Sequence, residues 1–247
     1  MNPAIVLKQW IRGQEAISQL ATAKKNLIVL RLAIFCLSLA TILIYLGEIL
    51  QNLAGYQGEH AVESFFENNS IAVVILFVGI IAPISEELIF RLPLDGRIGS
   101  IVVALITVFS MLTGLMIPGA ILALIIFLLS RRGRLSYQLK FKGRQQIWLV
   151  LFSAMAFAFF HGYNFENIDQ FWWLWPFLVL PQFIYGYVLG VIRLRFGFGY
   201  GVILHSLINL LASILAMASQ RTSDQLSYYQ SDGWVSILLV IVLIGWL

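Results

Sequence analysis

Long apolar runs, separated by short polar segments, dominate this sequence and leave few folds open to it. Hydrophobic residues make up 60% of the 247 residues, and charged residues only 11%. A water-soluble domain of this length needs a larger charged surface. A helix needs roughly 20 mostly apolar residues to cross the hydrocarbon of a bilayer. The sequence therefore predicts an all-α, polytopic transmembrane helical bundle.

The apolar runs that could cross a membrane are 32–50, 71–90, 98–130, 147–163, 171–192, 199–218 and 234–247. As a single helix, 98–130 would be about 50 Å long, which is too long for one upright crossing. Gly114, Pro118 and Gly119 lie near its middle and favour a turn. Splitting this run gives about eight crossings. It also places the basic residues between 131 and 144 on the side of the basic N-terminus, which the positive-inside rule assigns to the cytoplasm.

Residues 1–31 differ from the rest of the chain because their basic and apolar residues alternate. They have no continuous apolar core and no obvious cleavage site, so they predict an amphipathic helix on the membrane surface rather than a signal peptide. Residues 32–247 then form the bundle. The net charge of +4 is explained by basic residues between the apolar runs, and we expect no nucleic-acid partner. The single cysteine, Cys36, is expected to be a packing residue.

Ionisable residues inside an apolar run are costly and need a partner or a task. Glu87 and Arg91 are four residues apart with the acid first, which favours an ion pair along one helix. Glu86 points about 100° away around the helix and is left free. A carboxylate in a low-dielectric pocket binds protons more readily, which suits a general base for water. On spacing alone, the alternative that all three are interfacial charges stays open.

Two of the three histidines also lie in apolar runs. His161 follows Phe157 by four residues, so the aromatic ring is expected to flank the imidazole. His205 and Asn209 have the same spacing, and together they could hold an oxyanion or fix a water. A packed histidine and an interhelical hydrogen bond are the structural alternatives. Several costly groups in one chain favour a shared site, whereas His60, in the acidic loop after the first run, is expected to face solvent.

Taken together, these residues resemble the motif set of the CAAX-protease and bacteriocin-processing family of intramembrane endopeptidases. The three motifs are two glutamates followed after three residues by arginine, then Phe-x-x-x-His, then His-x-x-x-Asn. They occur in this order within 71–218 as Glu86, Glu87, Arg91, Phe157, His161, His205 and Asn209. Residues 98–146 lengthen the segment between the first two motifs, and they look like an inserted hairpin and basic loop.

The resemblance implies endoproteolysis inside the helical bundle of an integral membrane protein, expected in a bacterial-type plasma membrane with a cytoplasmic N-terminus. Glu86 would activate the attacking water, and His161 would position it. His205 and Asn209 would stabilise the oxyanion. The residues expected to support the site are Glu87, Arg91 and Phe157. The partners implied are the lipid bilayer and a peptide or protein substrate, either prenylated or carrying a leader peptide.

The cofactor stays open between none and a divalent metal such as zinc. Glu86, His161 and His205 could supply the three protein ligands of a catalytic zinc ion. The sequence has no His-Glu-x-x-His motif, and we favour a metal-free scheme in which glutamate acts directly on water. Two other functions compete with hydrolysis. One is a non-catalytic binding or immunity protein on the same scaffold, and the other is a transporter or channel whose pathway carries these charges.

Overall fold

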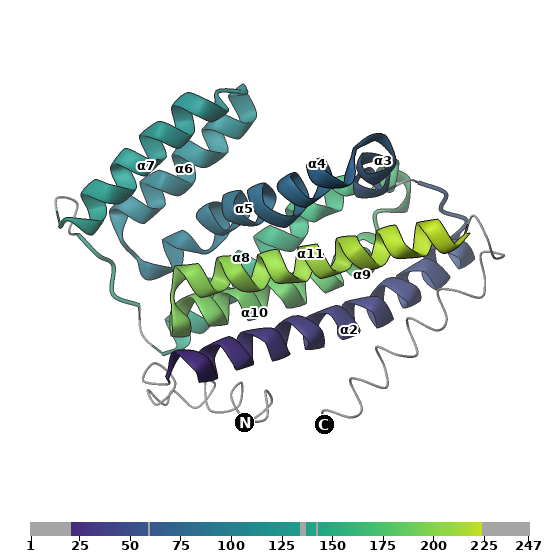
Figure 1. Ribbon diagram of the computed structural model, residues 1–247, viewed down its shortest axis with the longest axis horizontal. Helices are drawn as coiled ribbons and strands as arrows, with labels where there is room; N and C mark the ends of the chain where they lie inside the picture. The colour runs from purple at the N-terminus through teal and green to yellow at the C-terminus, as the bar shows by residue number, and fades with distance from the viewer. Residues whose placement is uncertain (1–20, 59, 134–136, 142, 224–247) are drawn as a thin grey trace.

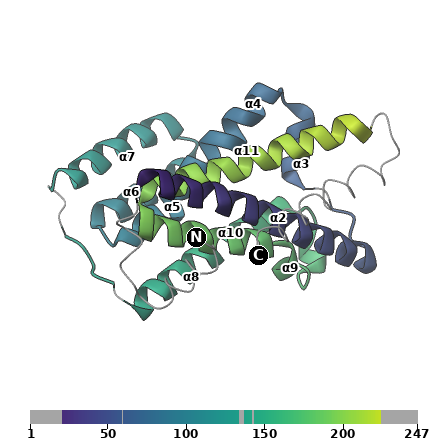
Figure 2. The ribbon, with the colours of Figure 1, turned by 60° about the horizontal axis from the view of Figure 1, so that its bottom comes forward.

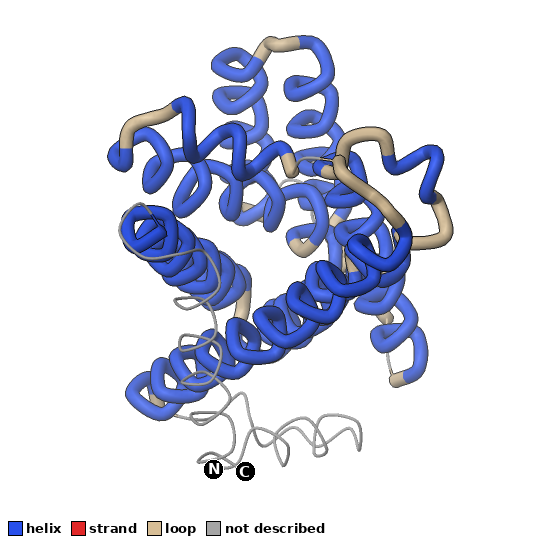
Figure 3. Tube along the Cα trace, turned by 90° about the vertical axis from the view of Figure 1, so that its right-hand side faces the viewer, coloured by secondary structure: helices blue, strands red, loops and turns tan. Residues whose placement is uncertain are grey.

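The computed structural model describes residues 21–58, 60–133, 137–141 and 143–223, and nearly all of them form helices joined by short loops (Figure 1). Within these ranges there is no β-strand (Figure 3). Two isolated bridges pair His60 with Phe165 and Arg97 with Gln138. The expected all-α class is confirmed.

The long helices of the bundle are α2 (Thr22–Ala54), α8 (Arg144–His161), α10 (Leu180–Phe196) and α11 (Phe198–Ser223). Helix α10 packs against the other three, and α2 also packs against α11 (Figure 2). Apolar side chains from α2, α10 and α11 meet in a core that includes Cys36, Leu189 and Leu204, none of them exposed. The cysteine is therefore a packing residue, as its apolar surroundings in the sequence indicated.

Small residues on α10 bring α8 close to it. A Cβ atom added at Gly186 would lie 2.9 Å from the Cα of Ala154, and one added at Gly190 would lie 2.8 Å from the side chain of Val150. Glycines four residues apart form a smooth strip on a helix, against which a second helix can pack closely. This packing fixes the register of α8, the helix that ends at His161.

The helical segment that carries the two glutamates is distorted, though not interrupted, just before it reaches them. Helix α4 (Ile71–Leu76) continues into a π-helical turn, η2 (Phe77–Ile81), and then into α5 (Ala82–Phe90) and a 3₁₀ turn, η3 (Leu92–Asp95). Pro83 has no N–H, so the carbonyl one turn before it loses its helical donor, and the local geometry changes there. Helix α5 then packs against α11 and α8.

The run 98–130 folds as the expected hairpin, made of α6 (Ile98–Thr113) and α7 (Met116–Arg131). Gly114 makes the turn with a φ of 73°, a left-handed value that glycine adopts without steric cost. Pro118 and Gly119 lie inside α7 and not in the turn. The hairpin stands apart from the bundle (Figure 1) and packs on it mainly through α5 and η3.

Within the described residues, four helical stretches are long and apolar enough to cross a membrane: Thr22–Ala54, Ile71–Asp95, Arg144–Asn164 and Phe198–Ala216. The hairpin helices have 16 residues each, which is about 24 Å against a hydrocarbon thickness of about 30 Å. The structure thus supports several crossings, and the number eight remains a prediction.

Two of the expected segment boundaries differ from the helix limits in the structure. The span expected over 171–192 was wrong at its start, because η5 (Ile168–Phe171) and α9 (Trp175–Leu178) precede α10, which begins at Leu180. Helix α2 begins at Thr22, so position 31 lies inside a continuous helix. The expected surface helix over residues 1–20 and the run 234–247 lie outside the described residues. The remaining elements are α3 (Ala61–Asn68) and the 3₁₀ turn η4 (Gly162–Asn164).

Candidate active site

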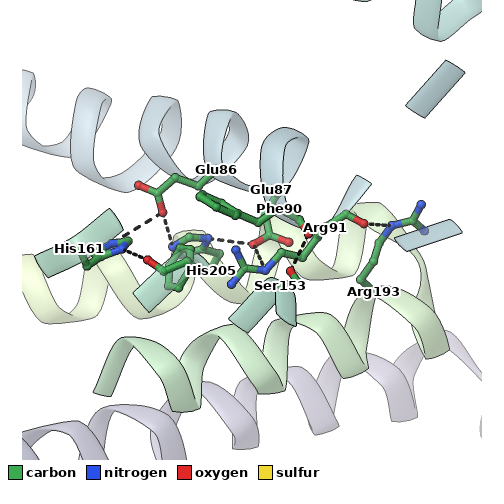
Figure 4. A network of polar contacts seen from close by, with 9 residues as sticks. Glu86, Glu87, Phe90, Arg91, Ser153, His161, Arg193 and His205 are labelled. Carbon is green, nitrogen blue, oxygen red and sulfur yellow. Dashed lines mark hydrogen bonds and ion pairs between the residues drawn. The ribbon is translucent and has the colours of Figure 1, made fainter. Parts of the chain in front are cut away.

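Side chains from three helices meet between α5, α8 and α11 (Figure 4). Glu86 and Glu87 lie on α5, His161 is the last residue of α8, and His205 lies in the second turn of α11. Phe157, one turn before His161, packs edge-on against the imidazole of His205 with ring centroids 5.6 Å apart. The end of α8 and the start of α11 are therefore level with each other at the site.

Glu87 and Arg91 form the ion pair that their spacing predicted. The Arg91 Nε lies 3.5 Å from Glu87 Oε1, and neither side chain is exposed. The guanidinium carbon lies 4.0 Å from the centroid of the Phe157 ring, which is favourable cation–π geometry. On the other side, a Cβ at Gly201 would lie 2.9 Å from Glu87 Oε2, so only glycine leaves room for this carboxylate.

His205 connects the two glutamates. Its Nδ1 lies 3.1 Å from Glu87 Oε1, and its Nε2 lies 3.4 Å from Glu86 Oε2. The Glu87 oxygen that pairs with Arg91 is an acceptor, so the Nδ1 of His205 carries a hydrogen and donates it to Glu87. The Nε2 of this buried imidazole is thereby directed at Glu86.

The ring of His161 is also oriented by a hydrogen bond from its Nδ1. Its Nδ1 donates to the backbone carbonyl of Phe157 at 2.8 Å, because a carbonyl oxygen can only accept. Its Nε2 then lies 4.0 Å from Glu86 Oε2. The side chains of His161 and Glu86 remain 22% and 23% exposed, so water or a substrate can reach them.

The Oε2 atom of Glu86 is the meeting point of the site. It is buried, and no residue in the described part of the chain forms a hydrogen bond to it. When both imidazoles are neutral, it faces the lone pairs of two Nε2 atoms. Such an arrangement is stable only if a proton or a cation is shared among the three atoms. The geometry thus supports proton transfer at this point.

Asn209, expected to act together with His205, forms a hydrogen bond to the backbone before α5. Its Nδ2 donates to the carbonyl of Val78, at 3.0 Å, in the π-helical turn that precedes α5. This hydrogen bond joins α11 to the distorted turn and engages one of the two N–H groups of the amide. The structure therefore brings together Glu86, His161 and His205, and Asn209 contacts the backbone that carries Glu86.

Whether the site could hold a metal depends on the arrangement and the chemistry of its donors. No three His, Cys, Asp or Glu side chains within the described ranges are arranged as a metal site. The chemistry of the donors nevertheless fits a divalent cation. Each imidazole has its Nδ1 bound to an acceptor and its Nε2 directed at Glu86, the usual arrangement of metal-binding histidines.

Three features of the site region lie outside the motif pattern. His60, expected to face solvent, is half buried: its Nδ1 accepts the Val62 N–H at the start of α3, and its ring packs on Phe165. Burial, and then the neighbouring His161, lower the pKa of His60. Ser153 donates to the carbonyl of Phe90 at 2.6 Å. The third feature is an ion pair between Arg193 and Asp95. Apart from the local bond to Val62, these contacts join segments far apart in the chain, and no sequence spacing indicates them.

One family model matches residues 68–211, described as "Type II CAAX prenyl endopeptidase Rce1-like". The matched segment is more than half of the chain, and it contains every residue of the site. No curated protein and no solved structure matches the chain.

Proposed function

Because the chain belongs to the Rce1-like family of type II CAAX prenyl endopeptidases, we propose that it is an intramembrane endopeptidase in which Glu86 activates water. Membership of this family supports an integral membrane protease whose substrate is a peptide or a protein. We further propose that the substrate is prenylated or carries a leader peptide, and that the enzyme works in a bacterial-type plasma membrane with its N-terminus in the cytoplasm.

The observation that carries this proposal is the convergence on Glu86 Oε2. Two imidazole Nε2 atoms, at 3.4 and 4.0 Å, face one partly exposed carboxylate. Both rings are oriented from behind through Nδ1, so their Nε2 atoms are available to a reactant. A carboxylate and two oriented imidazoles supply the general base and the electrostatic partners that amide hydrolysis needs.

In the proposed reaction, Glu86 accepts a proton from a water molecule. At the same time, the oxygen of that water attacks the carbonyl carbon of the peptide bond. The carbonyl oxygen becomes an oxyanion, which is stabilised by the Nε2–H of His205 or His161, in whichever ring holds the proton shared with Glu86 as an imidazolium. The C–N bond then breaks, and Glu86 returns the proton to the leaving amine. The second N–H of Asn209 would contribute to the oxyanion site. Glu87, which pairs with Arg91, holds His205, and the ring of Phe157 packs on Arg91 and on both imidazoles.

The same three side chains, Glu86, His161 and His205, would hold a divalent metal. A bound zinc ion would supply Lewis-acid polarisation of the peptide carbonyl. We favour the metal-free scheme because Glu86 itself can accept the proton of the water and return it to the leaving amine.

Replacing Glu86 with glutamine tests the proposal. Glu86→Gln keeps the shape of the side chain and removes its basicity, so peptide hydrolysis should fall by about 100-fold or more. Glu67→Gln, at an exposed position on α3, is the matched control and should cleave normally. Turnover should be measured on purified protein whose thermal unfolding equals that of the wild type.

Undiminished hydrolysis by folded Glu86→Gln would refute the mechanism. A binding or immunity protein would instead keep its cellular phenotype in this variant. A transporter or channel would pass ions or solutes in vesicles and hydrolyse no peptide.

A further inference from the structure

We propose that Arg193 is a positioning residue for the Glu86 site, acting through the end of α5. This inference deepens the proposed endopeptidase function and rests on it. Arg193 does not touch Glu86, His161 or His205. Its effect would pass through Arg91, the cationic half of the buried ion pair (Figure 4).

Arg193 lies in the last turn of α10, where a basic residue would ordinarily face the headgroups. It is instead 8% exposed. Its Nε donates to the backbone carbonyl of Arg91 at 3.1 Å, and its Nη2 donates to the carbonyl of Leu92 at 3.3 Å. Both carbonyls lie where α5 ends and the regular helical ladder stops. One guanidinium thus holds the two residues that directly follow the glutamate helix.

Asp95 completes the arrangement. Its Oδ2 accepts from the Nη2 of Arg193 at 3.0 Å and from the hydroxyl of Ser100, also at 3.0 Å. Its Oδ1 accepts the backbone N–H of Arg97 at 2.9 Å, just before α6 begins. The carboxylate is therefore fixed by two further donors, and the pair joins α10, η3 and α6 at one point.

The link from this pair to the site is a short series of contacts. Arg193 holds the backbone of Arg91, the Arg91 side chain pairs with Glu87, and Glu87 accepts from His205. A shift of the Arg91 backbone would move the Glu87 carboxylate and, with it, the imidazole that faces Glu86. The planar guanidinium of Arg193 makes its bonds to the Arg91 carbonyl, the Leu92 carbonyl and Asp95 at the same time. The ammonium group of a lysine has no such geometry.

The test compares Arg193→Gln, Arg193→Lys and Asp95→Asn in the full-length protein, with Arg132→Gln as the exposed arginine control. A peptide cleavage assay should show kcat reduced by up to about 100-fold in Arg193→Gln, because small displacements of catalytic groups are costly. KM should change by less than about twofold, since the substrate is not contacted. Arg193→Lys should recover only part of kcat, and Arg132→Gln should match the wild type.

A second readout does not depend on hydrolysis. The chain has three histidines, so NMR of ¹⁵N-histidine-labelled protein can follow each ring. Arg193→Gln and Asp95→Asn should both shift the ring signals of His205 and leave those of His60 in place. If the wild type cleaves no peptide, the proposed function fails, and the His205 signals still test the link.

Unchanged His205 signals together with wild-type kcat in folded Arg193→Gln would overturn the inference. If Arg193→Gln does not fold, Asp95→Asn, which keeps the shape of its side chain, decides by the same two readouts. A loss of kcat of equal size in Arg132→Gln would also overturn it.

Discussion

At the scale of single residues, the site depends on charges that have been removed from water. Arg91 and Glu87 are completely buried, and in the described part of the chain none of the Arg91 side-chain nitrogens forms a hydrogen bond. The guanidinium is stabilised by the Glu87 carboxylate and by the face of Phe157. Burying a charge costs several kcal/mol unless its partner is present. The pair is therefore sensitive to the loss of either member.

Arg91→Met tests this dependence, because it removes the cation and leaves Glu87 buried and unpaired. The free energy of unfolding should fall by about 3–5 kcal/mol, measured by reversible denaturation in detergent. The double variant Glu87→Gln, Arg91→Met, in which both charges are absent, should recover most of this loss. A single variant as stable as the wild type would mean that the pair does not stabilise the fold.

At the scale of elements, the hairpin of α6 and α7 packs on the bundle mainly through α5 and η3. Its helices expose large apolar residues, including Leu105, Leu112 and Ile117, at 64%, 81% and 77%. Such surfaces are expected to face lipid. At the base of the hairpin lie basic residues, Arg97, Arg131 and Arg132, whereas Leu115 at its turn is apolar and 52% exposed.

Cysteine labelling tests whether this hairpin crosses the bilayer. The one native cysteine can be replaced, as Cys36→Ala, to give a cysteine-free background. Eight crossings with cytoplasmic termini predict that Leu115→Cys reacts with an impermeant maleimide in intact cells. Arg132→Cys should react only after permeabilisation. Protection of Leu115→Cys from both sides would place the turn inside the bilayer and reduce the number of crossings.

At the scale of the whole molecule, the site exists only where separate helices meet. Helix α5 supplies the carboxylates, α8 and α11 supply the imidazoles, and α10 lies beside α8 and α11 and holds the end of α5 through Arg193. This arrangement encloses polar groups among apolar helices, where electrostatic interactions are stronger than in water. It is also compatible with a metal, so metal dependence is a property to be measured on the intact protein.

Chelation of the purified enzyme distinguishes the two schemes. Under the metal-free proposal, protein treated with a strong chelator and then freed of it should retain full turnover. Added zinc should not increase that turnover. Hydrolysis that disappears on chelation and returns with zinc would instead assign Glu86, His161 and His205 as ligands.

Much of the fold could be read from local patterns. The hairpin over 98–130 followed from its length and from Gly114, and the buried pair followed from the four-residue spacing of Glu87 and Arg91. The start of α10 was misplaced because the apolar composition of 171–179 is the same in a helix and in short turns. Hydrophobicity reports burial in lipid or protein, and it does not report helical continuity.

The sequence by itself determined the helical class, the apolar spans and the residues that had to find partners, because these follow from the environment of each segment and from contacts within one turn. The tertiary structure decided that His205 bridges both glutamates, that Asn209 binds Val78, and that Arg193 pairs with Asp95, 98 positions away. Such contacts depend on the tilt and register of packed helices. Those are set by many small contacts between separate helices, such as the packing of Gly186 on Ala154.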